Sequence, residues 1–379
     1  MADSNRYDAI VVGLGAMGAA ALQQLARRGV KVLGIEQHPI AHDLGSSHGT
    51  VRAIRKAYFE HPDYVPLLER SYELWNDLEN ATGEQLLNQC GLLLTAKPDS
   101  ETMRGLETCY AEHSLPHERL NAQEVQKRYP QITPPEDHTA LFDPSGGYVF
   151  AETSVRRLIT QAEGLGADVR IHEQVQGWKA DAQGVTVHTV DSEISAGSLI
   201  ITVGPWATTL LAELGVELKV LRKPQLWYDS PHIDRYRPPE FPCFATEMDS
   251  GFFYGFPALG DQGLKIAEHL GGSHVDDPSN IDRALHPGDE TEALEYLQQV
   301  FPRFAPRLKH FSICMYTKSP DDHFIIDTHP QFERVVLAAG FSGHGFKFAP
   351  LVGEVLTDLA IEGRTEHPID FLRLGRLTK

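Results

Sequence analysis

The sequence predicts an α/β protein built on a parallel sheet, into which a second, mainly antiparallel sheet is inserted. Three observations lead to this class. An apolar run at residues 9–12 passes directly into a glycine-rich turn and a helical pattern, which is typical of a buried parallel strand followed by a helix. Two later runs, 199–203 and 335–339, do the same. The segments between them are rich in aromatic and β-branched residues with Pro and Gly breaks, which favours antiparallel strands.

The first run carries a nucleotide-binding motif. Gly13, Gly15 and Gly18 supply G-x-G-x-x-G at the strand-to-helix turn. The first glycine allows the tight turn, the second lets the backbone approach a pyrophosphate, and the third lets the helix pack on the strand. The next predicted strand, 30–35, ends at Glu36, whose carboxylate can accept both hydroxyls of an adenosine ribose. These features favour a Rossmann-like dinucleotide-binding domain over a glycine turn in a nucleotide-free sheet, but they do not separate FAD from NAD.

The later runs are predicted to return to the same sheet. The 199–203 run ends at Gly204, with a helix from about Ala207, and the 335–339 run ends in a loop that contains Gly343 and Gly345. The helix after this loop has apolar residues along one face: Leu351, Val352, Val355, Leu356 and Leu359. Its positive end would stabilise negative charge on a reduced flavin, which favours FAD. We therefore expect a discontinuous FAD-binding domain (1–84, 150–215 and 318–379) and a substrate domain (85–149 and 216–317).

Composition argues against several classes of protein. The formal net charge of −18 opposes a nucleic-acid partner, which would require clustered Lys and Arg. The start of the chain lacks a basic segment before its apolar run, and the apolar stretch 199–216 is broken by Gly204, Pro205 and Glu213. Neither a secretory signal nor a membrane span is expected.

The spacing of the cysteines argues against a metal site and a disulfide framework. Four are widely scattered, with no pair at metal-ligand spacing: Cys90, Cys109, Cys243 and Cys314. A metal site or a disulfide framework is therefore not expected, and a cytoplasmic location follows as the default.

Four fragments together resemble a known family: SSHGTVRAIRKAYFEHPDYVPLLERS, GFFYGFPALGDQGLKIAEH, SICMYTKSPDDHFIID and AAGFSGHGFKFAP. Nearly end to end, the chain is similar to monomeric sarcosine oxidase and N-methyltryptophan oxidase, which are FAD-dependent amine oxidoreductases. The resemblance implies a flavin bonded through its 8α-methyl carbon to a cysteine sulfur. It also implies oxidation of the N-methyl group of a secondary amino acid, with oxygen reduced to hydrogen peroxide.

The resemblance further implies roles for single residues. Cys314 matches the flavin-linking cysteine, and Lys265 matches the lysine that activates oxygen. Arg55 and Lys347 match the pair that holds the substrate carboxylate, with Lys347 also expected at the cofactor. The remaining matches are the substrate-pocket side chains Tyr254, His269 and Tyr316, the flavin neighbours His48 and Arg52, and Val175 beside the adenine.

One segment departs from the family. Relatives usually read S-H-H-G-D-T-R, whereas residues 46–52 of this chain read S-S-H-G-T-V-R. The missing acid removes a partner for Arg52, which concerns the flavin environment more than the reaction class.

Without the resemblance, each of these residues has an ordinary structural alternative. Cys314 would be a small buried hydrophobe, Arg55 and Lys347 solvated charges, and Lys265 an edge-strand charge. Tyr254 and His269 would be core aromatics. The position of Lys347 between two phenylalanines, directly after a glycine-rich loop, speaks against a merely solubilising charge. A cation near Cys314 would favour the thiolate that must attack the flavin.

The sequence thus predicts a monomeric flavin oxidase that takes a small secondary amino acid and molecular oxygen, with sarcosine ahead of N-methyltryptophan and pipecolate. The fragment CMYTK favours sarcosine because it matches the sarcosine enzyme better. A pyridine-nucleotide dehydrogenase and a catalytically idle flavoprotein are the alternatives. Arg55, Lys265 and Lys347 together count against the idle protein. No protein base is assigned.

Overall fold

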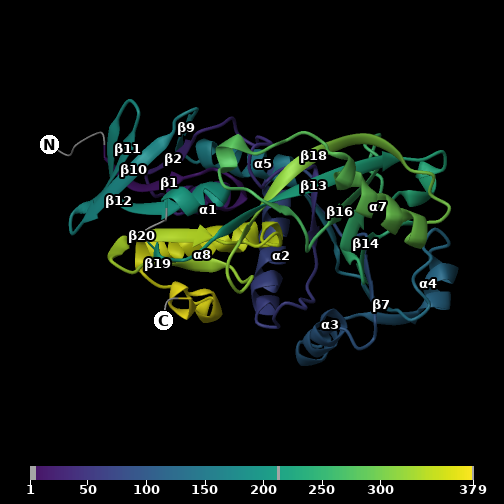
Figure 1. The fold of residues 1–379 in the computed structure, drawn as a ribbon. Helices are drawn as coiled ribbons and strands as arrows, with labels where there is room; N and C mark the ends of the chain where they lie inside the picture. The colour runs from purple at the N-terminus through teal and green to yellow at the C-terminus, as the bar shows by residue number, and fades with distance from the viewer. Residues whose placement is uncertain (1–5, 211–213, 378–379) are drawn as a thin grey trace.

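The computed structural model describes residues 6–210 and 214–377. The described strands form an eight-stranded, a nine-stranded and a three-stranded sheet. In Figure 1 the two large sheets occupy opposite ends of an elongated molecule, and α2 (Tyr64–Thr82) runs between them. The α/β class and the Rossmann-like character of the first sheet are confirmed.

The eight-stranded sheet has a parallel centre in the order β20, β12, β1, β2, β9. Antiparallel strands β10, β11 and β19 extend it. Along β1, Ala9 and Val11 belong to one apolar core and Ile10 and Val12 to another. The strand is therefore buried on both faces, as its continuous apolar run predicts. The strands are β1 (Tyr7–Val12), β2 (Val32–Glu36), β9 (Asp168–Ile171), β10 (Val175–Asp181), β11 (Gly184–Thr189), β12 (Glu193–Ile201), β19 (Ile325–His329) and β20 (Phe332–Ala339).

Three helices cover one face of this sheet: α1 (Ala16–Arg27), α5 (Ala151–Gly164) and α8 (Ala349–Glu362). Helix α1 packs against both others (Figure 1), and α8 approaches closely because a side chain at Gly353 would collide with Ala20. All five apolar residues predicted on one face of α8 are buried. A short 3₁₀ helix (Phe346–Phe348) separates the glycine-rich loop from α8, so the α-helix itself begins only at Ala349.

The nine-stranded sheet is mainly antiparallel, as predicted, although β5 and β14 pair in parallel. Its longest pairing joins β13 to β18 and sets Cys314 opposite Lys223. Helix α7 (Pro287–Val300) packs on this sheet. The strands are β5 (Leu92–Ala96), β6 (Glu118–Asn121), β7 (Thr139–Asp143), β13 (Lys219–Asp229), β14 (Cys243–Met248), β15 (Gly251–Phe256), β16 (Leu264–Glu268), β17 (Ser273–His274) and β18 (Arg307–Lys318). The remaining α-helices within residues 6–210 and 214–377 are α3 (Glu101–Glu112), α4 (Ala122–Arg128) and α6 (Ala207–Leu210).

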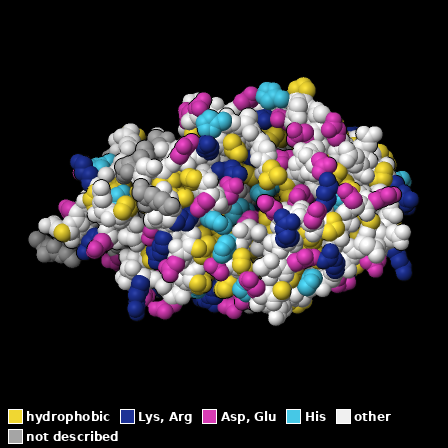
Figure 2. All heavy atoms as spheres, turned by 60° about the horizontal axis from the view of Figure 1, so that its bottom comes forward, with side chains coloured by type: hydrophobic (Ala, Val, Ile, Leu, Met, Phe, Trp, Pro, Cys, Tyr) yellow, Lys and Arg dark blue, Asp and Glu magenta, His cyan; other side chains and the backbone are white. Residues whose placement is uncertain are grey.

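A three-stranded sheet connects the two halves. It pairs β3 (Val51–Ile54) with β8 (Gly147–Phe150), and β8 with β4 (Leu87–Asn88). Strand β3 comes from the expected cofactor domain and β4 from the expected substrate domain, so the division into two domains stays a prediction. Figure 2 shows acidic and basic side chains interspersed over one face of the molecule. Across residues 6–210 and 214–377, no helix is long and apolar enough to cross a bilayer.

Candidate active site

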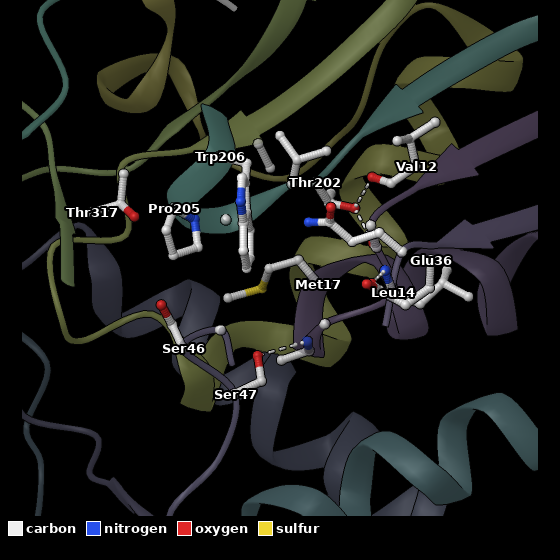
Figure 3. Close-up of a pocket in the computed structure, with 18 of the residues that line it drawn as sticks. Val12, Leu14, Met17, Glu36, Ser46, Ser47, Thr202, Pro205, Trp206 and Thr317 are labelled. Carbon is white, nitrogen blue, oxygen red and sulfur yellow. Dashed lines mark hydrogen bonds between the residues drawn. The ribbon is translucent and has the colours of Figure 1, made fainter. Parts of the chain in front are cut away.

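A cavity of about 840 Å³ opens at the carboxyl ends of β1 and β2, where parallel α/β sheets generally bind their ligands. In Figure 3 Glu36 lies at one end of the view and Ser46 and Thr317 at the other, with Met17 and Trp206 between them. Eight of the predicted cofactor residues line this cavity: Gly13, Gly15, Glu36, Val175, Gly204, Cys314, Gly343 and Gly345. Tyr316 and Arg52 line it as well.

The glycine motif shapes the floor of the cavity. A side chain at Gly13, where φ is 87°, would come within 2.6 Å of the Thr202 carbonyl oxygen. One at Gly18 would overlap the Gly13 carbonyl oxygen, so this glycine allows α1 to pack on β1 and does not line the cavity. The N-cap residue of α1, Gly15, has no side-chain cap, and the first turn of the helix contains no acid. Its positive end therefore faces the cavity in a form suited to a diphosphate.

Glu36 closes β2 as predicted. Its carboxylate accepts backbone N–H groups from Leu14 (2.8 Å) and His38 (3.0 Å). Burial raises the pKa of this carboxyl, and the backbone donors act in the opposite direction. Each oxygen retains a lone pair for a ribose hydroxyl.

Thr317 is a cavity residue that the sequence alone did not reveal. Its Oγ1 is buried and finds no hydrogen-bond partner among the described residues, although it borders the cavity. A buried hydroxyl without a partner is uncommon, so this atom is available to a polar group bound in the cavity. The N-terminal end of α1, the Glu36 carboxylate and the Thr317 hydroxyl together fit the diphosphate, ribose and other polar groups of a dinucleotide cofactor.

Cys314 is 1% exposed and lies on β18, at the wall of the cavity. The Arg52 guanidinium donates to its Sγ at 3.4 Å, and the Ser46 carbonyl lies 3.8 Å from the same sulfur. Arg52 is thus the cation expected near this thiol. Two other thiols, Cys90 and Cys243, lie 3.8 Å apart without a disulfide.

A second, smaller cavity of about 90 Å³ adjoins the first. The two share Arg52, Gly343 and Phe346 as lining residues. The smaller cavity also contains four of the predicted substrate residues: Arg55, Lys347, Tyr254 and His269. Most of its remaining wall is apolar, formed by Phe59, Leu92, Leu94, Phe244, Ala245 and Phe252.

Arg55 and Lys347, far apart in the sequence, meet at this cavity. Arg55 is 8% exposed and Lys347 4% exposed, and both stack on the ring of Tyr58, at 4.3 Å and 5.1 Å from its centroid. Lys347 Nζ donates to the His344 carbonyl (2.6 Å) and the Tyr58 hydroxyl (3.3 Å). Burial, and then the Arg55 charge, lower the pKa of Lys347 to about 7.

Arg55 already holds a carboxylate. Glu60 accepts both of its Nη2 contacts, at 2.8 and 2.9 Å, and it lines the same cavity. Sequence reasoning missed Glu60, although it lies five residues after Arg55 in a fragment that carried the resemblance. The geometry shows that this guanidinium accommodates a carboxylate at the cavity.

Three predicted pocket side chains form a hydrogen-bonded chain at the junction of the cavities. The Tyr254 and Tyr316 hydroxyls are 3.2 Å apart, and His269 Nδ1 is 3.5 Å from the Tyr316 hydroxyl. Burial raises the pKa of both phenols and lowers the pKa of His269 to about 3. At neutral pH all three groups are therefore uncharged.

Lys265 and His48 lie behind the cavities and line neither of them. Lys265 is 1% exposed on β16, an internal strand between β13 and β15, so the edge-strand alternative is wrong. Its Nζ donates to the carbonyls of Gly49 (2.6 Å) and Val51 (3.0 Å). His48 is buried against Ser312, with 3.2 Å between His48 Nδ1 and Ser312 Oγ.

The segment that departs from the family has its own partners. Thr50 Oγ1 donates to Gln262 (2.8 Å), and Arg52 contacts Gln225 Oε1 (3.4 Å). The backbone N–H groups of Gly49 and Thr50 donate to the carboxylate of Glu152. A carboxylate is therefore present at this loop, supplied by α5.

Comparison with known proteins shows the family to which the chain belongs. Residues 8–359 match the model of the FAD dependent oxidoreductase family. A monomeric sarcosine oxidase from Bacillus sp. (strain B-0618) is 40% identical over 98% of this chain and 97% of its own. This chain belongs to the FAD-dependent amine oxidoreductase family of monomeric sarcosine oxidase and N-methyl-L-tryptophan oxidase.

Two further relatives of this FAD-dependent oxidoreductase show how widely the fold is shared. An N-methyl-L-tryptophan oxidase from Yersinia pestis (strain Pestoides F) is 36% identical over 98% of this chain and 99% of its own. The solved structure of NikD, described as an unusual amino acid oxidase essential for nikkomycin biosynthesis, superposes with a TM-score of 0.87 at 25% identity, covering 98% of each chain. The pyridine-nucleotide dehydrogenase alternative is thereby set aside.

Proposed function

We propose that this FAD-dependent oxidoreductase oxidises N-methyl amino acids, sarcosine first among them. Substrate, oxygen and water would give the demethylated amino acid, formaldehyde and hydrogen peroxide. The observation that supports this most directly is the pair of buried cations, Arg55 and Lys347, on the wall of a small cavity that adjoins the cofactor cavity. A carboxylate is the group that such a pair recognises with both charge and geometry.

The size of the smaller cavity favours sarcosine over N-methyltryptophan. Its volume of about 90 Å³ leaves room for a few water-sized groups. A substrate as small as sarcosine suits such a space better than N-methyltryptophan, whose indole ring would meet the apolar wall that includes Phe59, Phe244 and Phe252. The name of the sarcosine relative points to the same substrate.

FAD, when bound, supplies the redox chemistry, accepting hydrogen from the N-methyl C–H bond and passing electrons to oxygen. Arg55 and Lys347 would orient the substrate by its carboxylate. The wall formed by Tyr254, His269 and Tyr316 is uncharged, and the charged residues of the smaller cavity are three cations, Arg52, Arg55 and Lys347, and one carboxylate, Glu60. Such surroundings favour the neutral amine, whose lone pair assists loss of hydrogen from the adjacent carbon.

We also infer that Cys314 bonds the flavin covalently and that the enzyme works as a monomer. The covalent bond is supported by the buried thiol at the cavity wall with the Arg52 guanidinium 3.4 Å away. A denaturing gel should show a fluorescent band, and the intact mass should exceed that of the chain by one FAD. Cys314→Ser should release its flavin on denaturation. A wild-type mass equal to the bare polypeptide would contradict the bond.

The substrate proposal is tested with an oxygen electrode and a panel of N-methyl amino acids. Sarcosine should give the highest kcat/KM, N-methyltryptophan and pipecolate less. N-methylglycinamide, which lacks the carboxylate, should be consumed at least roughly 10²-fold less efficiently, because the buried cations lose their partner. Equal rates for sarcosine and its amide would overturn the anchoring role.

A further inference from the structure

The loop at residues 49–51 lies between two charged side chains of opposite sign. On one side, Lys265 Nζ donates to the carbonyls of Gly49 (2.6 Å) and Val51 (3.0 Å). On the other, the Glu152 carboxylate accepts the N–H of Gly49 (2.7 Å) and of Thr50 (3.0 and 3.2 Å). The peptide groups of the loop thus connect an ammonium to a carboxylate.

The loop conformation depends on such support. Thr50 has φ of 67°, a left-handed conformation that is rare for a β-branched residue and persists only where surrounding contacts hold it. The Thr50 carbonyl accepts from the Ala151 backbone N–H at 2.8 Å, and its hydroxyl donates to Gln262. Glu152, in the first turn of α5, therefore continues a set of contacts that fixes the loop to that helix.

Glu152 also differs in charge from the other titratable groups around Lys265. Lys265 lies buried between the rings of Trp227 (4.9 Å) and Phe256 (5.2 Å). The titratable groups that act on it or are acted on by it come from several elements: Arg52 on β3, Cys314 and His310 on β18, His48 in the preceding loop, and Glu152 on α5. Among these, Glu152 is the carboxylate.

We propose that Glu152 is a positioning residue for Lys265. It binds the N–H of Thr50, which belongs to the same peptide group as the Gly49 carbonyl to which the lysine donates. It also supplies negative charge near the partly buried Arg52 and the buried Lys265. This inference rests on the proposed oxidase function and on the oxygen-activating role that the family resemblance implies for Lys265. In this chain Glu152 would supply the negative charge that relatives carry as an aspartate at the position of Thr50.

The direction of the expected effect follows from the charges. Burial and the Arg52 charge lower the pKa of Lys265 well below its usual value, whereas Cys314 and Glu152 raise it. Removing the negative charge at Glu152 lowers that pKa further. If oxygen reduction needs the ammonium form, reoxidation of the reduced flavin should decline at a lower pH than in the wild type.

The experiment compares Glu152→Gln with wild-type holoenzyme. Glutamine keeps an acceptor for the loop N–H groups but carries no charge. At low pH the reoxidation rate of Glu152→Gln, measured by stopped flow, should match that of the wild type. The rate at pH 9 divided by the rate at pH 7 should be roughly threefold or more smaller in the variant than in the wild type. Anaerobic reduction by sarcosine should stay within about twofold, since this chemistry does not involve Lys265.

A second readout does not use activity. With [ε-¹³C]lysine labelling, the Lys265 signal is assigned by its loss in Lys265→Met, and its titration midpoint should move to lower pH in Glu152→Gln. Glu152→Asp retains the charge on a shorter arm. It should keep the wild-type midpoint while slowing reoxidation.

A matched control is available in Glu79→Gln. Glu79 likewise accepts two successive backbone N–H groups, from Leu86 and Leu87, but it lies on α2. It should change neither the pH profile nor the Lys265 signal. A wild-type pH profile and titration midpoint in Glu152→Gln would overturn the proposal. If Lys265→Met reoxidises normally, the oxygen role itself fails, while the lysine titration still tests Glu152.

Discussion

Two arginine–lysine pairs, Arg55 with Lys347 and Arg52 with Lys265, are built from similar parts but bind their carboxylates differently. Each arginine belongs to β3 or the residue after it, each lysine is almost fully buried, and each lysine contacts two aromatic rings. At Arg55 the carboxylate of Glu60 binds the guanidinium itself. At Arg52 the carboxylate of Glu152 binds the backbone. The first arrangement leaves a cation that an incoming carboxylate can compete for, whereas the second makes the acid a permanent part of the site.

The largest effect is expected at the Arg52–Lys265 pair. Lys265→Met removes the buried lysine for which an oxygen-activating role is expected. Reoxidation of the reduced flavin should slow by roughly 10²–10³-fold, equivalent to about 3–4 kcal/mol of electrostatic stabilisation. Stopped-flow mixing of reduced enzyme with oxygen measures this, with anaerobic reduction by sarcosine as the control. Unchanged reoxidation would remove the distinction between the two pairs.

The Arg55–Lys347 pair should control the affinity for ligands that carry a carboxylate. Arg55→Ala or Lys347→Ala should weaken binding of the carboxylate inhibitor methylthioacetate by roughly 10²-fold or more, because its buried charge loses a partner. Arg55→Lys should recover only part of the loss, since a point charge cannot replace the guanidinium fork. Flavin absorbance follows the titration. Affinity within about twofold of wild type in both alanine variants would reject the anchor.

The same pair should respond to pH. Lys347, with its pKa lowered to about 7, is cationic below that pH and neutral above it, and a bound carboxylate favours the cation. Methylthioacetate affinity should therefore be highest below pH 7 and fall by up to about tenfold per unit as pH rises through 7. The inhibitor has no amine, so its own charge stays constant over this range. Lys347→Met should flatten the profile, whereas a slope that survives this change would assign it to another group.

The smallest effect concerns Glu60. Glu60→Gln removes the anion that competes for Arg55, so methylthioacetate should bind roughly three- to tenfold more tightly. The double variant Arg55→Ala/Glu60→Gln should bind better than Arg55→Ala alone, since no unpaired carboxylate then repels the ligand. Weaker binding in Glu60→Gln would show that Glu60 orients Arg55 for the ligand and does not compete with it.

What could be predicted from sequence follows from how local each feature is. The strand–turn–helix around Gly13, Gly15 and Gly18 is contiguous, so its fold and its place at the cofactor cavity were readable directly. The meeting of Arg55 with Lys347 became predictable only through the family resemblance, because periodicity carries no information on contacts across the chain.

Other features were beyond reach. The parallel pairing of β5 with β14 and the internal position of β16 depend on strand order, which no local pattern encodes. Glu152 looks from sequence like an acid in the first turn of a helix, favoured there by the dipole, and its bond to a distant loop leaves no mark in its own segment. Thr317 sits in a resembling fragment, but its free hydroxyl is visible only in three dimensions.

The long pairing of β13 with β18 has a mechanical consequence. Cys314 belongs to the nine-stranded sheet, while the glycine turn that faces the same cavity belongs to the eight-stranded one. A cofactor bonded to the sulfur and bound at that turn would link the two sheets, in addition to the short β3–β8–β4 sheet. The two sheets would then unfold in one cooperative transition, so the cofactor would stabilise the fold as well as take part in the reaction.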